Sequence, residues 1–325
     1  MATIAQFREV LKRQVDGGEL GHGVGDSGAL VEAACRAGGH RWRDRFWTPL
    51  VTFHTFLLQV LHMGSSCREA VALALSWRAA LGLRVPSDDP CAYCQARKRL
   101  PEEALSVAVR NVGRRLREEV SGTLTWLGRR VWLVDGTTCS MPDTPELQSA
   151  FGHPLHQVAG CGFPVAKVVA LFCWASGAVW EAAIGPLRRS ELHLWRTLWS
   201  ALSPGEIVLA DRFYCSFYDL VGVLRRSCDA VFRLHQRRSD DFRRGRRLGK
   251  DDRQVTWLRP KWQARPRGMN RLQWKALPAT LTVRLIRFPW PPPDSAAARS
   301  RWPRRCWTRS DFPPPGSRPC TGTAG

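Results

Sequence analysis

The first 125 residues show a helical pattern of apolar positions. Large apolar side chains recur three and four positions apart in residues 45–64, 66–82 and 101–120, and the first two segments end on glycine. The third has proline in its first turn, glutamates behind it and arginines towards its end, which complements the helix dipole. The pattern predicts an all-helical region over residues 1–125.

From residue 130 the pattern changes to short buried strands that alternate with helices. The predicted elements are, in chain order, a strand at 130–136, a strand pair at 167–175 and 177–185, a helix at 190–202, a strand at 206–212, a helix at 217–226 and a strand at 229–235. This order predicts a mixed α/β sheet flanked by helices, within residues 126–235.

The remaining residues form two segments of different composition. Residues 236–285 are polar, basic and rich in β-forming residues, which predicts short antiparallel strands with basic loops. From residue 289 onward there is no Leu, Ile, Val or Met, so this stretch cannot bury enough apolar area to offset its chain entropy. We expect residues 286–325 to be disordered. Their mixture of Pro, Arg, Ala, Ser, Trp and Cys is typical of a GC-rich gene translated out of frame, and we hypothesise a frameshift or truncation after about residue 286.

Composition excludes several classes of protein. Hydrophobic residues make up 44% and charged residues 24% of the chain, which is ordinary for a folded protein. The best apolar run, 168–180, is shorter than the ~20 residues of a membrane span and contains Gly177. The first residues carry charges where a secretory signal would be apolar, and the eleven scattered cysteines are typical of reduced thiols. We expect a cytoplasmic protein without a membrane partner.

Charge is concentrated in the last third of the chain. The chain has 49 Lys and Arg against 28 Asp and Glu, and residues 231–325 alone hold 23 basic and 6 acidic residues. Such an excess indicates a polyanionic partner that meets the last third. In the helical region, Arg41, Arg43, Arg45 and the basic run 95–99 are either further DNA contacts or solvated helix faces.

Two acids end two of the predicted strands. Asp135 follows the apolar run VWLV, and Asp211 follows IVLA. In a sheet of this order the two strands can be neighbours, so both side chains would leave the same edge. Adjacent carboxylates repel each other unless a cation neutralises them, and oxygen ligands favour Mg²⁺ or Mn²⁺. The alternative is that both are ordinary turn or capping acids.

Several blocks of sequence resemble the DDE transposases of the insertion-sequence-4 family. They are VWLVDGTTCSMPDTPELQSAFGHP (131–154), GCGFPVAKVVALF (160–172), IGPLRRSELHLW (184–195), PGEIVLADRFYCSF (204–217) and VFRLHQRRSDDFRRGRRLGKDDRQVTWLRP (231–260). Upstream, PLVTFHTFLLQVL (49–61) and CAYCQARKRLPEEAL (91–105) resemble the helical N-terminal region of the same proteins. The likeness covers roughly residues 40–285.

The resemblance implies an RNase H-like catalytic core, a DNA-binding helical region before it and a β-rich insertion at 236–285. It implies metal-dependent phosphodiester cleavage and strand transfer by a cut-and-paste mechanism with Mg²⁺, in which Asp135 and Asp211 are the first two metal-binding acids. The partners would be double-stranded transposon ends and target DNA in the nucleoid of a bacterial cytosol, and a homodimer in a synaptic complex stays an open alternative. The insertion would contact DNA through its basic residues, which are Arg237, Arg238, Arg243, Arg244, Arg246, Arg247 and Lys250.

The chain departs from this family in its last part. The third acid of the family lies in a signature Tyr-x2-Arg-x3-Glu-x6-Lys, and this sequence has no Glu after Glu206 and no Tyr after Tyr218. Three hypotheses follow: a transposase that is defective because its third acid is missing, a catalytically inactive DNA-binding remnant, and an RNase H-like nuclease that uses Glu191 as a substitute metal ligand. The alternative is a structural role, in which Glu191 stabilises the N-terminus of its helix.

Overall fold

The computed structural model describes residues 30–119, 125–287 and 306–307, apart from residues 44, 63–64, 81, 83, 155–161, 236–241, 263–264 and 268. It divides into two compact units, Met1–Glu119 and Val120–Gly325, which we call the helical unit and the sheet unit. The division falls where the sequence pattern changes from helices to alternating strands.

The helical unit contains a helix over residues 30–37, followed by α3 (Pro49–Leu61), α4 (Cys67–Ala80), α5 (Pro90–Arg99) and α6 (Glu102–Glu119). The side chains of Thr48 and Asp89 cap α3 and α5, and a proline follows each cap. The helix predicted from residue 45 therefore begins only at Pro49, because the residue before a proline is disfavoured in helical conformation. One apolar cluster surrounds Phe53 and a second surrounds Tyr93.

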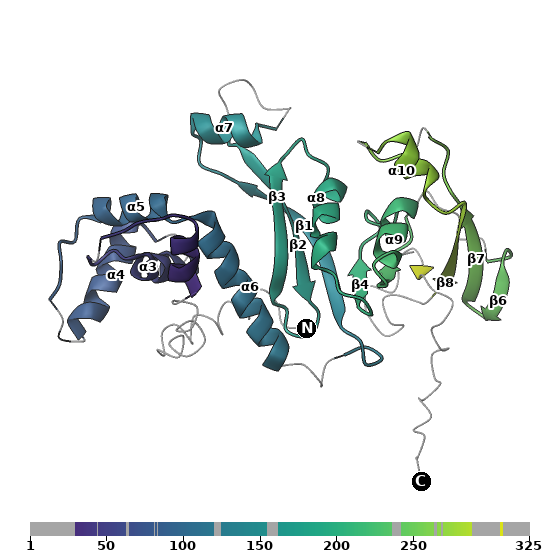
Figure 1. Ribbon diagram of the computed structural model, residues 1–325, viewed down its shortest axis with the longest axis horizontal. Helices are drawn as coiled ribbons and strands as arrows, with labels where there is room; N and C mark the ends of the chain where they lie inside the picture. Colours follow the sequence, from purple (N-terminus) through teal and green to yellow (C-terminus); the bar gives the residue numbers. More distant parts are fainter. Residues whose placement is uncertain are drawn as a thin grey trace, which may run out of the picture. The chain divides into compact units, whose positions relative to one another are not determined.

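A five-stranded sheet lies in the sheet unit (Figure 1). Its strands are β1 (Val131–Ser140), β2 (Val165–Cys173), β3 (Val179–Pro186), β4 (Ile207–Ala210) and β5 (Asp229–Phe232). In space their order is β3-β2-β1-β4-β5; β2 is antiparallel to β1 and β3, whereas β4 and β5 run parallel to β1. The mixed α/β sheet predicted from the sequence is confirmed.

Strand β1 is longer than the sequence predicted. It continues beyond Asp135 to Ser140, because β2 pairs with it as far as Ser140↔Val165. Strand β4 pairs with only its first part, up to Val134↔Ala210. The prediction that the strand ends at Asp135 is wrong; Asp135 marks the point where the parallel pairing ends.

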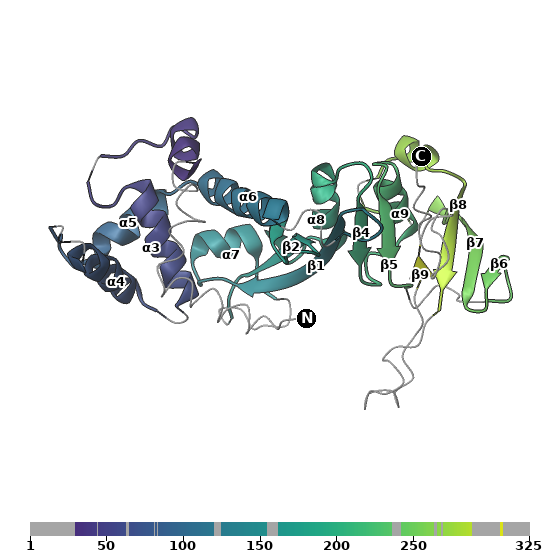
Figure 2. The same cartoon turned by 90° about the horizontal axis from the view of Figure 1, so that it is seen from below.

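The helices over residues 191–197 and 217–224, labelled α8 and α9 in Figure 2, pack on one face of this sheet. The helices of the region are α7 (Pro145–Phe151), α8 (Glu191–Thr197), which a 3-10 turn (Leu198–Ala201) continues, and α9 (Phe217–Leu224). Trp132 of β1 shares a buried cluster with Trp195 of α8 and Leu220 of α9. Gly222 of α9 lies against Trp199, where a β-carbon would come within 2.1 Å of the indole ring, so a side chain there would displace the tryptophan.

A second, antiparallel sheet follows β5 along the chain. Its strands, in both chain and spatial order, are β6 (Arg246–Gly249), β7 (Asp252–Leu258), β8 (Thr280–Ile286) and β9 (Cys306–Trp307), and α10 (Arg271–Lys275) lies between β7 and β8. Ile286 in β8 and the two residues of β9 depart from the disorder predicted for residues 286–325. Residues 288–305 and 308–325 lie outside the described residues.

Candidate active site

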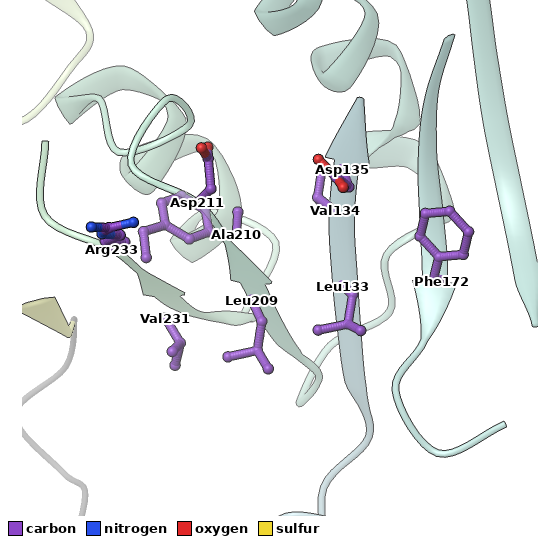
Figure 3. A pocket seen from close by; sticks show the side chains of 10 residues that line it. Leu133, Val134, Asp135, Phe172, Leu209, Ala210, Asp211, Val231 and Arg233 are labelled. Carbon is purple, nitrogen blue, oxygen red and sulfur yellow. The ribbon is translucent and has the colours of Figure 1, made fainter. Parts of the chain in front are cut away.

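Asp135 and Asp211 lie together where the parallel pairing of β1 with β4 ends. Strands β1 and β4 are parallel neighbours whose last paired residues are Val134 and Ala210. Asp135 directly follows Val134 in the sequence, and Asp211 directly follows Ala210. Both side chains are exposed, and Figure 3 shows their carboxylates just beyond the paired segments of the two strands. The strand register therefore brings these two sequence-predicted residues side by side, and we call them the acid pair.

In each member of the acid pair, one carboxylate oxygen accepts a hydrogen bond from a nearby backbone N–H group. The backbone N–H of Gly136 donates to Asp135 Oδ1 at 2.8 Å, and that of Phe213 donates to Asp211 Oδ1 at 2.7 Å. These bonds fix the orientation of both side chains. Within the described part of the chain, the Oδ2 atom of either acid has no hydrogen-bond partner, so an oxygen from each remains for a ligand.

A pocket of about 550 Å³ opens beside the acid pair. Its wall is apolar and includes Leu133 and Leu209, which lie two positions before the acids and so share their face of the sheet. Arg233 also lines it (Figure 3). Because Ala210 pairs with Phe232, Arg233 is the neighbour of Asp211 on the next strand. Where the parallel pairing of the three adjacent strands ends, the next residues are thus two acids and one cation.

Glu191 lies close to the acid pair but on the other face of β1. It begins α8, and its Oε1 atom would be 2.2 Å from a β-carbon added to Gly136, so its carboxylate rests against the backbone of β1. Side chains of consecutive strand residues point to opposite faces, which separates the side of Gly136 from that of Asp135. Among the residues that the structure describes, no three His, Cys, Asp or Glu side chains form a group that could hold a metal ion.

The buried hydroxyl of Tyr214 holds Glu191 in this position. It donates to Glu191 Oε1 at 2.5 Å, and Tyr214 is 1% exposed. Burial, then the bond to Glu191, then the charges of Glu191, Asp135 and Asp211 raise the pKa of Tyr214 far above its ordinary value. The hydroxyl therefore stays protonated and remains a donor, within the field of all three carboxylates.

Sequence reasoning missed both Tyr214 and Arg233. Tyr214 lies three positions after Asp211 in the turn before α9, so its proximity to a candidate ligand was the available signal. Arg233 lies within the strand predicted at 229–235 and had no comparable signal, because its neighbour Asp211 is identified only by the pairing of β4 with β5.

The basic segment proposed for DNA contact is exposed where the structure describes it. Arg237 and Arg238 lie outside the described residues. The side chains on β6 and in the turns around it are exposed; they are Arg243, Arg244, Arg246, Arg247 and Lys250. Arg284 of β8 differs, since it is 3% exposed and its Nε donates to Asp252 Oδ1 at 2.9 Å. The charge of Arg284 is neutralised inside the second sheet, whereas the β6 side chains face solvent.

The chain is similar to one curated protein named "Putative transposase InsZ", from Escherichia coli (strain K12). The two are 27% identical over 105 residues, which cover 32% of this chain and 35% of that protein. The match therefore spans about a third of the relative's own length, and it suggests a transposase. No family model matches the chain. Among the described residues, no helix is long and apolar enough to cross a membrane.

Proposed function

We propose that this chain is a DNA transposase of the DDE type, related to the insertion-sequence-4 family, with Asp135 and Asp211 as its first two metal-binding acids. The observation that carries the proposal is the parallel pairing of β1 with β4, which sets the two acids side by side. The strand order β3-β2-β1-β4-β5 and its strand directions support an RNase H-like core. The similarity to the E. coli protein supports transposition as the activity and DNA as the partner.

The acid pair suits Mg²⁺ or Mn²⁺. Its available donors are carboxylate oxygens, which hard divalent cations prefer, and Mg²⁺ usually takes one or two carboxylates together with waters and substrate phosphates. When bound, such an ion supplies Lewis-acid stabilisation and an activated attacking oxygen for phosphoryl transfer. Asp135 and Asp211 would hold it, each through its Oδ2 atom.

The other residues of the site would act on the DNA or on the acids. Arg233 offers a cation beside Asp211, suited to a phosphate oxygen of the scissile strand. Leu133 and Leu209 give the pocket an apolar wall beside the acids. Tyr214 keeps Glu191 against β1 and away from the side on which Asp135 projects.

We infer that the chain as it stands binds metal and DNA but transfers strands poorly. The sequence lacks the Glu of the family's C-terminal signature, and the hydrogen bond from Tyr214 to Glu191 weighs against a nuclease that uses Glu191 in its place. The frameshift hypothesis is tested by resequencing the gene and translating the other two frames from codon 285. A Tyr-x2-Arg-x3-Glu-x6-Lys signature in either frame supports it, and its absence from both rejects it.

Metal binding is tested by thermal unfolding of the full chain in EDTA and in Mn²⁺. At a Mn²⁺ concentration about tenfold above its dissociation constant, binding to the native state contributes ~1.4 kcal/mol, which raises Tm by about 3–6 °C. Asp135→Asn or Asp211→Asn should abolish this rise. Asp143→Asn, which alters an exposed acid of the same unit, should retain it. An equal rise in all four proteins would place the metal elsewhere.

Activity and DNA binding give two further tests. On DNA ends from repeats that flank the gene, we expect little strand transfer with Mg²⁺ or Mn²⁺; robust cleavage that Asp135→Ala abolishes would show that no further acid is needed. Binding of duplex DNA should weaken steeply with salt, and replacing Arg243, Arg244, Arg246 and Arg247 by alanine should reduce the slope of log K against log salt by about 3.6. An unchanged slope would exclude β6 as the contact.

A further inference from the structure

The helical unit contains a basic groove that is separate from the acid pair. Four exposed arginines line it: Arg41, Arg43 and Arg45 come from the segment before α3, and Arg99 ends α5. The groove has a volume of about 720 Å³. Among its described lining residues the acidic one is Asp89, which caps α5 by accepting from the backbone N–H of Cys91 at 3.0 Å. The described lining of the groove therefore carries four cations against one acid.

Aromatic side chains alternate with these arginines along the groove. Trp42, Phe46 and Trp47 all line it. Trp42 is held by a stacked contact with His40, with ring centroids 5.9 Å apart, and Trp47 packs on Tyr93 at 5.1 Å. Both rings are half-buried, so one part of each is fixed in the unit while another part faces the groove.

Thr52 gives the groove an unpartnered polar group. It is 1% exposed and lines the groove, and its Oγ1 atom has no hydrogen-bond partner within the described residues. A buried hydroxyl without a partner lowers the stability of the free protein. Such groups are rare in folded proteins, and a polar ligand in the groove offers one explanation of its presence here.

We propose that this groove binds a single strand of DNA, with phosphates on Arg41, Arg43, Arg45 and Arg99 and unpaired bases stacked on the aromatic rings. Positive charge that follows a sugar-phosphate backbone, interleaved with aromatic faces, is the arrangement by which proteins bind unpaired strands. A duplex is the less suitable ligand, because its bases are already stacked on each other. The inference rests on the proposed function for the choice of DNA as the ligand, and it specifies an unpaired strand as the form that the helical unit binds.

The test is fluorescence anisotropy of a labelled (dT)15 strand with the full chain in EDTA. The double variant Arg41→Ala/Arg45→Ala should bind at least tenfold more weakly, and its slope of log K against log salt should be smaller by about 1.4, at ~0.7 per phosphate contact. The matched control is Lys98→Ala, which removes an exposed cation of α5 next to Arg99 but outside the groove, and it should bind as the unaltered protein does.

Two outcomes would overturn the proposal: equal losses in the double variant and in Lys98→Ala, or a 15-base-pair duplex that competes as well as the strand. Circular dichroism and Tm of each variant show whether the helices are intact. A strand that carries 2-aminopurine adds a measurement of stacking, since its fluorescence should fall on saturation, and no change would refute the stacked arrangement. The EDTA in the assay removes divalent cations, which keeps this test independent of the metal site.

Discussion

The ion pair between Arg196 and Asp219 joins the two helices next to the acid pair. Arg196 of α8 donates its Nε and Nη2 to the two carboxylate oxygens of Asp219 on α9, at 2.8 and 2.9 Å. Asp219 is fully buried, whereas the side chain of Arg196 is 19% exposed. Ser216 caps α9 by accepting from the backbone N–H of Asp219 and donates its hydroxyl to the same carboxylate. Asp219 is therefore the centre of a polar network within an apolar core.

We predict that Asp219→Ala strongly destabilises the sheet unit. The change removes the acceptor of three side-chain hydrogen bonds and leaves Arg196 without its counter-charge. Breaking a buried pair from one side costs about 3–5 kcal/mol. Arg196 keeps some solvent contact and its guanidinium lies 4.7 Å from the ring of Tyr218, so we expect a value near the lower limit. A loss of ~3 kcal/mol corresponds to a fall in Tm of about 6–12 °C for a unit of this size.

The measurement is urea unfolding of the full chain, followed by tryptophan fluorescence, for Asp219→Ala, Arg196→Met and the double variant. If the two residues form a unit, the double variant should lose much less free energy of unfolding than the two single losses combined. Asp143→Asn, at an exposed site of the same unit, serves as the control for removal of a negative charge. Additivity within about 0.5 kcal/mol would refute the reasoning, because it would mean that the pair contributes no coupling between α8 and α9.

Three further changes test other parts of the structure. Tyr214→Phe should lower the free energy of unfolding by about 1–3 kcal/mol, since it removes the donor to Glu191; urea unfolding measures it, and no loss would contradict the bond. Thr52→Val should raise Tm, because it replaces an unpartnered buried hydroxyl by a methyl group of the same shape, and a fall would show that the hydroxyl has a partner. Burial raises the pKa of Cys228 from 9.0 to about 11, so its contribution to stability should be complete below pH 9 and lost as the pH rises through 11. Measuring the free energy of unfolding at pH 8 and at pH 11 checks the direction of this effect. Between these two pH values, Cys228→Ala should lose less stability than the unaltered protein.

The sequence was sufficient to predict the parts of the fold that local pattern determines. Apolar runs followed by Asp135 and Asp211 predicted two strands with acids behind them, and the order of elements was enough to expect these strands to be neighbours. The full length of β1 could not be predicted from local pattern, because the residues after Asp135 become a strand only through their pairing with β2. A polar stretch has no strand pattern of its own when its partner decides its conformation.

Contacts between distant residues account for the rest. The bond from Tyr214 to Glu191 joins α8 to the turn before α9, and the groove brings Arg41 together with Arg99. In each case the residues are ordinary in their local sequence, and their chemistry follows only from the packing of helices. Residue types and spacing identify candidate ligands along a strand, but they do not identify a residue that orients a ligand from another element.

The position of β1 between β2 and β4 has a consequence for the order in which the sheet folds. The β2–β3 hairpin closes over a short loop, whereas the pairing of β1 with β4 must enclose everything between Asp135 and Asp211, a separation of 76 positions. Long closures form late in folding, since their entropic cost precedes their contacts. The acid pair therefore comes together only once this long-range pairing has formed, and a chain without the pairing would keep the two acids apart. Under the proposed function, Mn²⁺ affinity would therefore report whether the native pairing of β1 with β4 is complete.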